Sequence, residues 1–328
     1  MSKNTGMQVV VTSIKKVADA VKCFRFVPVD GSDAVLPRFS GGSHVVVTMK
    51  GRDAAGNTVT YRNPYSLMSS PDDSSCFEIS VLRTEASRGG SHFMHDQVKE
   101  GDILTISNPV NLFPISAGGR KHIFIAGGIG ITPFMAMMDA LAARHGKFEL
   151  HYGFRSRTHG AYWRELEERY GRNRVMTYCQ AEGQMIDFDN LLEHQPLGTH
   201  LYVCGPAPMI EAVKKKAREA GWPDENVHSE EFLAPPSGKP FIVKLKKSQR
   251  DVMVGEHQSI LEALEAANVD ANFLCRGGAC GQCETVVCSA DGEIEHNDHY
   301  LSKDERESGK KIMICVSRLN GREIVLDL

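Results

Sequence analysis

Four cysteines constrain this chain more than any other feature of its sequence. Cys275, Cys280 and Cys283 form a Cys-x4-Cys-x2-Cys triplet, and 31 residues separate Cys283 from Cys315. This is the ligand spacing of a plant-type [2Fe–2S] cluster, in which four thiolates hold two irons. Zinc sites instead favour a Cys-x2–4-Cys pair together with a second pair or with histidines. The spacing therefore predicts a [2Fe–2S] cluster; a zinc site and four unrelated cysteines are the alternatives.

The residues between these cysteines suit a loop that closes tightly around a cluster. The segment 273–283 reads FLCRGGACGQC. Gly277, Gly278 and Gly281 permit positive φ angles and a close approach of the backbone. Backbone N–H groups in such a loop can point at the sulfides and stabilise negative charge there. Because such a cluster carries one electron at a time, we expect a protein that moves electrons.

Length and composition exclude several other classes of protein. The chain has 328 residues, which is too many for one small core and predicts two or three domains. Its net charge of −3 shows no bias toward nucleic acid or anionic membranes. No apolar stretch approaches the ~18 residues of a membrane span, and the start, MSKNTGMQVVVTSIKK, lacks the apolar core of a signal peptide. Nine cysteines in a chain this long do not indicate a disulfide scaffold, so we expect a cytoplasmic protein.

Three patterns follow one another along the chain. Residues 1–114 contain short alternating runs between Gly, Pro, Asp and Ser turns, which is typical of an antiparallel β-barrel. In residues 115–232 strand-like and helical runs alternate, which predicts βαβ units with a parallel sheet. Residues 233–240, LAPPSGKP, indicate a linker. The remaining residues, 241–328, hold the cluster cysteines and carry 11 basic and 15 acidic side chains, a net charge of −4.

A glycine-rich turn follows the first strand of the βαβ series. The sequence GGIGITP occupies residues 127–133, after the apolar run HIFIA. Such a turn lets backbone N–H groups approach a pyrophosphate, and Gly127, Gly128 and Gly130 would serve that approach. A second predicted strand ends in VCGP at residues 203–206. We expect both turns at the carboxyl ends of parallel strands, where open α/β sheets bind ligands.

Taken in order, these features resemble the phthalate dioxygenase reductase type of the ferredoxin–NADP reductase superfamily. The resemblance covers nearly the whole chain and rests on the ordered motifs YSL (65–67), RGGS (88–91), GGIGITP (127–133), CGP (204–206), HSEEF (228–232) and the four cysteines. It implies a flavin-binding barrel, an α/β NAD-binding domain and a C-terminal β-grasp [2Fe–2S] ferredoxin domain. It also implies electron transfer from NAD(P)H through a flavin and the cluster to an oxygenase.

The flavin motif of that family is shifted in this chain. The family has Arg-x-Tyr-Ser, whereas residues 62–66 have one residue too many between Arg62 and Tyr65. By resemblance, Tyr65 packs on the flavin and Ser66 forms a hydrogen bond near its N5 atom, within a motif that ends at Leu67. Arg62 either reaches the flavin phosphate or simply faces solvent.

The resemblance also implies a second set of flavin contacts. These are Ser80, Val81 and Leu82 along one strand, Thr132 from the nucleotide domain and Phe232 ahead of the linker. Ser66, Thr132 and Cys204 would shape the catalytic pocket in which hydride passes from nicotinamide to flavin. Without the resemblance, Phe232 would be interpreted as core packing and Cys204 as a small buried apolar residue.

The RGGS segment predicts a site for a terminal phosphate. Arg88 supplies charge, while Gly89, Gly90 and Ser91 supply backbone and hydroxyl donors at close range. FMN ends in such a phosphate, whereas FAD continues into an adenosine. We therefore predict FMN, with FAD as the alternative.

The choice of nicotinamide cofactor depends on a segment after the second strand of the βαβ series. Arg155, Ser156 and Arg157 offer donors and positive charge suited to the 2′-phosphate of NADPH. No acidic residue for the ribose hydroxyls of NADH is obvious. Similar segments occur in NADH-using relatives, so we predict NADH, with NADPH as the alternative. Gly205 and Pro206 would complete the nucleotide site.

The electron acceptor lies outside this chain, which has no evident Rieske pair or mononuclear iron triad. By resemblance, the protein is a monomer and its partner is the oxygenase component of a two-component Rieske system, for aromatic ring dihydroxylation or demethylation. A reductase for a cytochrome P450 or another oxygenase is the main alternative, and a redox sensor without turnover is a second. The acidic C-terminal module predicts docking on a basic face of the partner.

Overall fold

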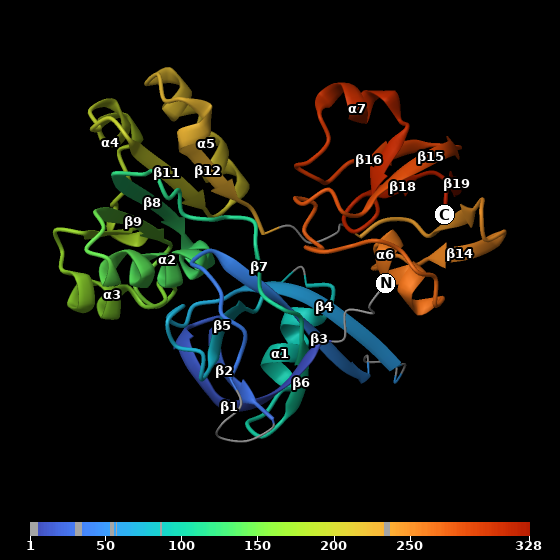
Figure 1. Cartoon of the computed structure of the whole chain (residues 1–328), viewed down its shortest axis with the longest axis horizontal. Coiled ribbons are helices and arrows are strands. Elements are labelled where there is room, and N and C mark those ends of the chain that lie inside the picture. Colours follow the sequence, from blue (N-terminus) through green and yellow to red (C-terminus); the bar gives the residue numbers. More distant parts are fainter. Residues whose placement is uncertain (1–5, 30–34, 53–55, 57, 86, 233–236) are drawn as a thin grey trace. The chain divides into compact units, whose positions relative to one another are not determined.

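The chain folds into two compact units, the first ending at Glu231 and the second beginning at Phe232. The computed structural model describes residues 6–29, 35–52, 56, 58–85, 87–232 and 237–328 (Figure 1). Of the predicted linker at 233–240, residues 233–236 thus lie outside the described part of the chain. Among the described helices, none combines the length and the apolar character needed to cross a membrane.

The N-terminal part of the first unit is an antiparallel sheet that curves into a barrel (blue to cyan in Figure 1). Its strands follow the order β4-β3-β6-β1-β2-β5, and the short β7 pairs with β3. The elements are β1 Met7–Ala18, β2 Val21–Pro28, β3 Ser43–Arg52, β4 Thr58–Ser66, β5 Phe77–Leu82, α1 Gly90–Asp96, β6 Ile103–Ile106 and β7 Val110–Asn111. The predicted antiparallel barrel is confirmed.

Alternation along β4 separates an inner face from an outer face. Residues that pair directly across an antiparallel ladder lie on the same face of the sheet. Tyr61, Asn63 and Tyr65 pair with the residues of β3 that belong to the barrel core. Arg62 and Ser66 alternate with them and therefore lie on the opposite face.

The second part of the first unit is a five-stranded parallel sheet between two layers of helices. The strand order is β10-β9-β8-β11-β12, so the order reverses between β8 and β11. Apolar residues of α2 and α3 pack on one face, and those of α4 and α5 on the other. The elements are β8 Lys121–Gly127, η1 Gly128–Ile131, α2 Thr132–Ala143, β9 Phe148–Phe154, α3 Trp163–Tyr170, β10 Val175–Cys179, η2 Gln180–Glu182, α4 Phe188–Glu193, β11 Thr199–Cys204, α5 Ala207–Glu219, η3 Asp224–Asn226 and β12 Val227–Glu230. The predicted βαβ series is confirmed.

The second unit has the predicted β-grasp fold. Its main sheet follows the order β14-β13-β19-β15-β17, in which β13 and β19 are parallel and the other neighbours antiparallel. Apolar residues of α6 share one core with this sheet. The elements are β13 Phe241–Leu245, β14 Arg250–Val254, α6 Ile260–Ala266, β15 Glu284–Ala290, β16 Glu293–Glu295, α7 Lys303–Ser308, β17 Lys311–Met313, β18 Arg318–Asn320 and β19 Glu323–Leu326.

A buried arginine fixes the start of the second unit. Arg318 is fully buried and donates to the carbonyl oxygens of Gly238, Lys239 and Gly255 at 3.2, 3.0 and 3.2 Å. Its guanidinium lies 5.3 Å from the centre of the Phe241 ring. Because a buried charge is tolerated only with its partners in place, the last residues of the predicted linker are held to this unit.

Candidate flavin, nucleotide and cluster sites

The Gly-Gly-Ser segment, residues 89–91, lies against the inner face of β4. Gly89 precedes α1 with a φ of 115°, a left-handed value that favours glycine. A Cβ atom on Gly89 would lie 2.5 Å from the Tyr61 ring, and one on Gly90 would lie 2.5 Å from the Asn63 amide. The two glycines therefore allow a closer approach to β4 than any residue with a side chain.

Polar groups gather where these two segments meet. The Nδ2 atom of Asn63 donates to the Tyr65 hydroxyl at 3.2 Å. Burial raises the pKa of Tyr65 to about 12, so this hydroxyl stays protonated at neutral pH. Ser91 is buried with its hydroxyl 3.3 Å from that of Thr84, and the half-buried Arg88 directly precedes the glycines. These groups are of the kind that binds a phosphate ester.

Arg62 lies on the face of β4 opposite to this cluster. It pairs with Thr48, whereas Asn63 is the β4 residue that contacts the Gly-Gly-Ser segment. The shifted motif explains this placement, because a move of one residue along a strand transfers a side chain to the other face. The family arginine stands two residues before the tyrosine, which is where this chain has Asn63. That spacing was the signal for Asn63, which sequence reasoning missed.

The predicted flavin strand on β5 contacts the nucleotide part of the unit. The Ser80 hydroxyl lies 2.6 Å from that of Tyr162, which precedes α3. Leu82 packs in a small apolar cluster that also includes Tyr162. Val81, which alternates with these residues, belongs to the barrel core. The outer face of β5 thus borders the α/β part of the unit.

The remaining predicted ring contacts lie in different parts of the chain. Ser66 and Thr132 are 6% and 2% exposed, and Thr132 donates from Oγ1 to the carbonyl oxygen of Ile129 at 3.0 Å. Leu67 is fully buried in the barrel core. Phe232 is 48% exposed and belongs to the second unit, so its place near the flavin stays a prediction.

The two predicted nucleotide turns are in contact with each other. They follow β8 and β11, which are neighbours at the point where the strand order reverses. A Cβ atom on Gly130 would lie 2.2 Å from the carbonyl oxygen of Cys204, and one on Gly205 would lie 3.0 Å from the Cα of Gly127. The same turns contain the remaining predicted residues, Gly128 and Pro206. Open α/β sheets bind their ligands at such a reversal point.

A half-buried acid beside Cys204, whose carboxyl oxygen Oε2 is buried, is a candidate functional residue that sequence reasoning missed. Cys204 is fully buried, and burial raises the pKa of its thiol. Its partner across the β11–β12 ladder is Glu230. Burial raises the pKa of Glu230 to about 8, and its Oε2 atom has no hydrogen-bond partner among the described residues. A carboxyl group that titrates near neutral pH in such a place is a candidate proton carrier. Its place in the HSEEF motif was the available signal.

Arg157 is already engaged by an acid. Its Nε and Nη2 atoms donate to the two carboxylate oxygens of Glu182, each at 2.8 Å, and its guanidinium lies 4.5 Å from the centre of the Trp163 ring. The Ser156 hydroxyl bonds within its own loop, and Arg155 is exposed. Glu182 is 25 residues from Arg157 in sequence, which is why sequence reasoning did not find this acidic partner.

The four predicted cluster ligands lie as two pairs of thiols. The Cys275 and Cys280 thiols interact with each other, and so do the Cys283 and Cys315 thiols. Within the described ranges, no three His, Cys, Asp or Glu side chains converge as ligands of one ion. A [2Fe–2S] cluster needs two thiolates on each iron, with sulfides completing the coordination, so these residues fit that group.

Within each pair the thiolate form is favoured at one cysteine, because the partner thiol lowers the pKa of Cys275 and of Cys283 while the same contacts raise the pKa of Cys280 and of Cys315. The Cys280 thiol and then backbone N–H groups lower the pKa of Cys275, and one of these donors, the N–H of Gly277, lies 3.4 Å from its sulfur. Thiolates are the forms that bind iron. Gly278 and Gly281 have φ angles of 71° and 75°, as expected for this loop.

The third positive φ in the loop belongs to Arg276 rather than to Gly277. Arg276 has a φ of 55°, a value that costs a non-glycine residue about 1–2 kcal/mol. Its guanidinium pairs with Glu265 of α6 and lies 4.2 Å from the centre of the Phe273 ring. These contacts hold the residue in place, and glycine at 277 is not required for the turn.

The first unit combines a barrel with an α/β nucleotide sheet, and the second is a β-grasp unit with four paired thiols. Together these features define a class of protein, the flavin and nicotinamide oxidoreductases that contain a [2Fe–2S] domain. Residues 243–320 match the 2Fe-2S iron-sulfur cluster binding domain. Residues 107–227 match the family described as dimethylamine monooxygenase subunit DmmA-like, N-terminal domain. The chain belongs to the phthalate dioxygenase reductase type of oxygenase reductases, as its motifs predicted.

Individual relatives support this assignment. The chain is 46% identical to the carnitine monooxygenase reductase subunit of Acinetobacter baumannii, over 97% of both chains. It is 41% identical to the heme-dependent oxidative N-demethylase beta subunit of Ectopseudomonas mendocina, over 99% of this chain and 100% of that one. A solved phthalate dioxygenase reductase, described as a modular structure for electron transfer from pyridine nucleotides to [2Fe–2S], has a TM-score of 0.85, 33% identity and 98% coverage of both chains.

Proposed function

We propose that this protein transfers electrons from NADH through FMN and the [2Fe–2S] cluster to the oxygenase component of a two-component Rieske system. The observation that carries the proposal is the pairing of Cys275 with Cys280 and of Cys283 with Cys315, in a chain that also holds the elements of a flavin and nucleotide reductase. The predicted domains at 1–114, 115–232 and 241–328 are part of this proposal.

The chain's own contribution is to position the reacting groups and to exclude water. A bound flavin links a two-electron donor to a one-electron acceptor. Ser66, Thr132 and Cys204 are all buried, so a pocket that they shape would be screened from solvent. Glu230, beside Cys204, can hold or release a proton at its carboxyl group near pH 8.

The proposed flavin is FMN. Arg88, the close backbone of Gly89 and Gly90, and the Ser91 hydroxyl supply the charge and donors that a terminal phosphate needs. Asn63 adds an amide on the facing strand. Release of the bound flavin by heat, followed by mass spectrometry, tests this directly: FMN is expected, and FAD would contradict the proposal.

The proposed nucleotide is NADH. Glu182 accepts from the Nε and Nη2 atoms of Arg157, one of the residues that sequence reasoning assigned to a possible 2′-phosphate. A 2′-phosphate at this place would meet the carboxylate of Glu182, and like charges repel. The ribose hydroxyls of NADH can instead donate to that carboxylate.

A charge-neutral substitution tests this choice. The Glu182→Gln variant removes the repulsion, so we expect the ratio of kcat/KM for NADH to that for NADPH to fall about tenfold, or about 1.4 kcal/mol. Glu219→Gln is the matched control, because Glu219 is also an exposed acid paired with a basic residue, Lys216. An unchanged ratio in Glu182→Gln would contradict the assigned role.

The relatives support two kinds of oxygenase as the acceptor. Carnitine monooxygenase reductase subunits, together with the resemblance to phthalate dioxygenase reductase, favour a Rieske oxygenase. The heme-dependent oxidative N-demethylase beta subunit makes a haem oxygenase the second candidate. The NADH-driven reduction rates of purified examples of both kinds would separate the two. We expect faster reduction of the Rieske protein at low salt and a slower rate at high salt, since the unit at 241–328 carries a net charge of −4.

A reducing compartment and a monomeric state complete the proposal. None of the nine cysteines, all of which lie in the described part of the chain, forms a disulfide, and this supports a cytoplasmic protein. Light scattering on the purified protein tests the monomer against any larger assembly.

A further inference from the structure

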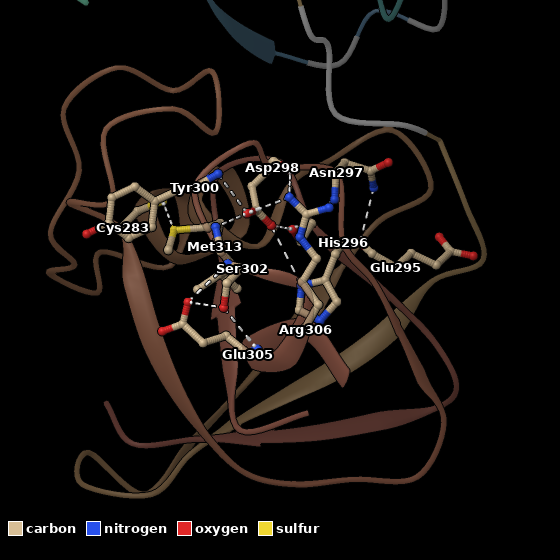
Figure 2. A network of polar contacts seen from close by, with 12 residues as sticks. Cys283, Glu295, His296, Asn297, Asp298, Tyr300, Ser302, Glu305, Arg306 and Met313 are labelled. Atoms are coloured by element: carbon tan, nitrogen blue, oxygen red, sulfur yellow. Dashed lines mark hydrogen bonds and ion pairs between the residues drawn. The ribbon is translucent and has the colours of Figure 1, made fainter. Parts of the chain in front are cut away.

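One buried carboxylate lies between the two segments that carry the cluster cysteines. The Asp298 side chain is fully buried at the centre of the polar network in Figure 2. Its Oδ2 atom accepts from the backbone N–H groups of Leu301 at 2.8 Å and of Tyr300 at 3.1 Å. Its Oδ1 atom accepts from the Ser317 hydroxyl at 3.4 Å. Such a set of donors fixes the segment around Asp298, since a buried charge is stable only when its bonds are satisfied.

The segment around Asp298 packs against the loop that holds the first three cluster cysteines. The backbone N–H of His299 donates to the carbonyl oxygen of Gly278 at 3.0 Å. A Cβ atom on Gly278 would lie 3.0 Å from the Cα of Asp298, and one on Gly281 would lie 2.3 Å from the Tyr300 ring. The path of the cysteine loop therefore depends on the place of residues 298–300.

The same carboxylate reaches the segment of the fourth cysteine. Ser317 is fully buried and lies two residues after Cys315. In addition to its bond to Asp298, its hydroxyl accepts from the backbone N–H of Asn297 at 3.3 Å. Asp298 and its neighbours thus join two cysteine segments that are distant in sequence and must hold one cluster.

Arg306 compensates the charge of Asp298. An Nη2 atom of Arg306, on α7, lies 3.6 Å from the carboxylate and also donates to the carbonyl oxygen of Asp298 (Figure 2). The imidazole of His296 is 3.7 Å away, but burial lowers its pKa, so it is neutral at pH 7. The local charge balance is therefore set by Asp298 against Arg306.

We propose that Asp298 is a positioning residue for the cluster: it holds the two cysteine segments in register, and its charge, balanced by Arg306, sets the reduction potential. The inference rests on the proposed [2Fe–2S] cluster in this unit. One-electron reduction adds a negative charge to a cluster, so a nearby anion disfavours it and a nearby cation favours it. The low dielectric around the fully buried Asp298 strengthens its effect, whereas solvent partly screens the charge of Arg306, whose side chain is 35% exposed.

Two substitutions of opposite sign test the charge role in the full chain. Asp298→Asn keeps the shape but leaves Arg306 uncompensated, so the reduction equilibrium is expected to shift at least tenfold toward the reduced cluster, which is 59 mV for a one-electron couple. Arg306→Gln is expected to shift it in the opposite direction. The measurement is an anaerobic redox titration followed by the EPR signal of the reduced cluster, with iron and sulfide content determined on the same samples.

Asp291 provides a matched control elsewhere in the unit. Its carboxylate also accepts from two backbone N–H groups, those of Arg322 at 2.7 Å and Glu323 at 2.9 Å, and also pairs with an arginine, at 3.4 Å. In the described part of the chain, no hydrogen bond or ion pair of Asp291 reaches either cysteine segment. Asp291→Asn is therefore expected to lose similar bonds without a change in potential.

The iron and sulfide content and the reduction potential together distinguish a failure of the role of Asp298 from a failure of the proposed function. Loaded clusters with unshifted potentials in both Asp298→Asn and Arg306→Gln would overturn the charge role, as would an equal shift in Asp291→Asn. If Asp298→Asn folds but assembles no cluster while Asp291→Asn loads normally, the positioning role is supported and Arg306→Gln still decides the charge role. If the unsubstituted protein contains no iron and sulfide, the proposed function fails instead.

Discussion

Gly130 illustrates how one residue can join two turns of the nucleotide site. Its backbone lies against the backbone of Cys204 and Gly205, so that a Cβ atom would be 2.2 Å from a carbonyl oxygen. Backbone at that distance cannot rotate away as a side chain can. The contact therefore permits only glycine at this position.

Gly130→Ala is expected to push the two turns apart. Overpacking of this kind typically costs 1–3 kcal/mol, and because the turns lie at the predicted nucleotide site, KM for NADH should rise about tenfold or more. Iron and sulfide content should be unchanged, since the cluster cysteines lie in the other unit. Gly118→Ala is the control, because nothing lies within 4 Å of a Cβ atom there. Equal KM values for the two variants would contradict the role of Gly130.

Glu230 makes the stability of its sheet depend on pH. Burial raises its pKa from 4.5 to about 8, so its contribution to stability is fully present below pH 4.5 and is lost as the pH rises through 8. Glu230→Gln removes this dependence. The free energy of unfolding of the variant, relative to that of the wild type, should rise between pH 5 and pH 8 by at least about 1.4 kcal/mol, the equivalent of one pKa unit.

Tryptophan fluorescence can follow this effect in urea. Both tryptophans of the chain, Trp163 and Trp222, lie in the α/β part of the first unit, so their signal reports on that sheet. Glu219→Gln, at an exposed acid, should follow the wild type at both pH values. A Glu230→Gln advantage that is the same at pH 5 and pH 8 would rule out the assigned titration.

Three neighbouring strands of the parallel sheet place histidines near their amino-terminal ends. His122 of β8 is the direct partner of His200 of β11, and the Nδ1 atom of His200 lies 3.0 Å from the Nε2 atom of His228 on β12. The rings of His122 and His200 are stacked with centres 6.3 Å apart. The starts of these strands lie at the edge of the sheet opposite to the nucleotide turns. We therefore assign this row of histidines, His122, His200 and His228, to the structure of the sheet and not to the nucleotide site.

Acid should destabilise this sheet through His122. Burial, and then the charge of His200, lower the pKa of His122 to about 4. The unfolded chain binds a proton near pH 6.5 and the folded sheet does not, so stability present above pH 6.5 is lost as the pH falls toward 4. His122→Phe keeps an aromatic ring beside Phe124 and Tyr202 and should reduce the loss in urea midpoint between pH 7.5 and pH 5.

The exposed His194 supplies the control for this element. It is 80% exposed, so His194→Gln should leave the acid sensitivity of the tryptophan-monitored transition unchanged. An acid sensitivity in His122→Phe equal to that of the wild type would show that the row of histidines does not govern the stability of the sheet.

At the scale of the whole molecule, the sequence predicted the fold class and the kind of site because both depend on local patterns. Alternating runs, βαβ periodicity and cysteine spacing are properties of short segments, and each was sufficient to predict its element. The contacts that sequence reasoning missed join distant segments: Glu182 with Arg157, Glu230 with Cys204. Asn63 was missed for a different reason, because its face on β4 depends on register, which one inserted residue reverses.

In the proposed route, electrons pass from NADH through the flavin to the cluster within one chain. The most direct test is an anaerobic titration of the purified protein with NADH, followed by visible absorbance and low-temperature EPR. We expect flavin bleaching together with the EPR signal of a reduced [2Fe–2S] cluster, and in Cys280→Ser flavin bleaching without that signal; this result would support the proposed route. Flavin bleaching with no cluster signal in the unsubstituted, iron-loaded protein would contradict it.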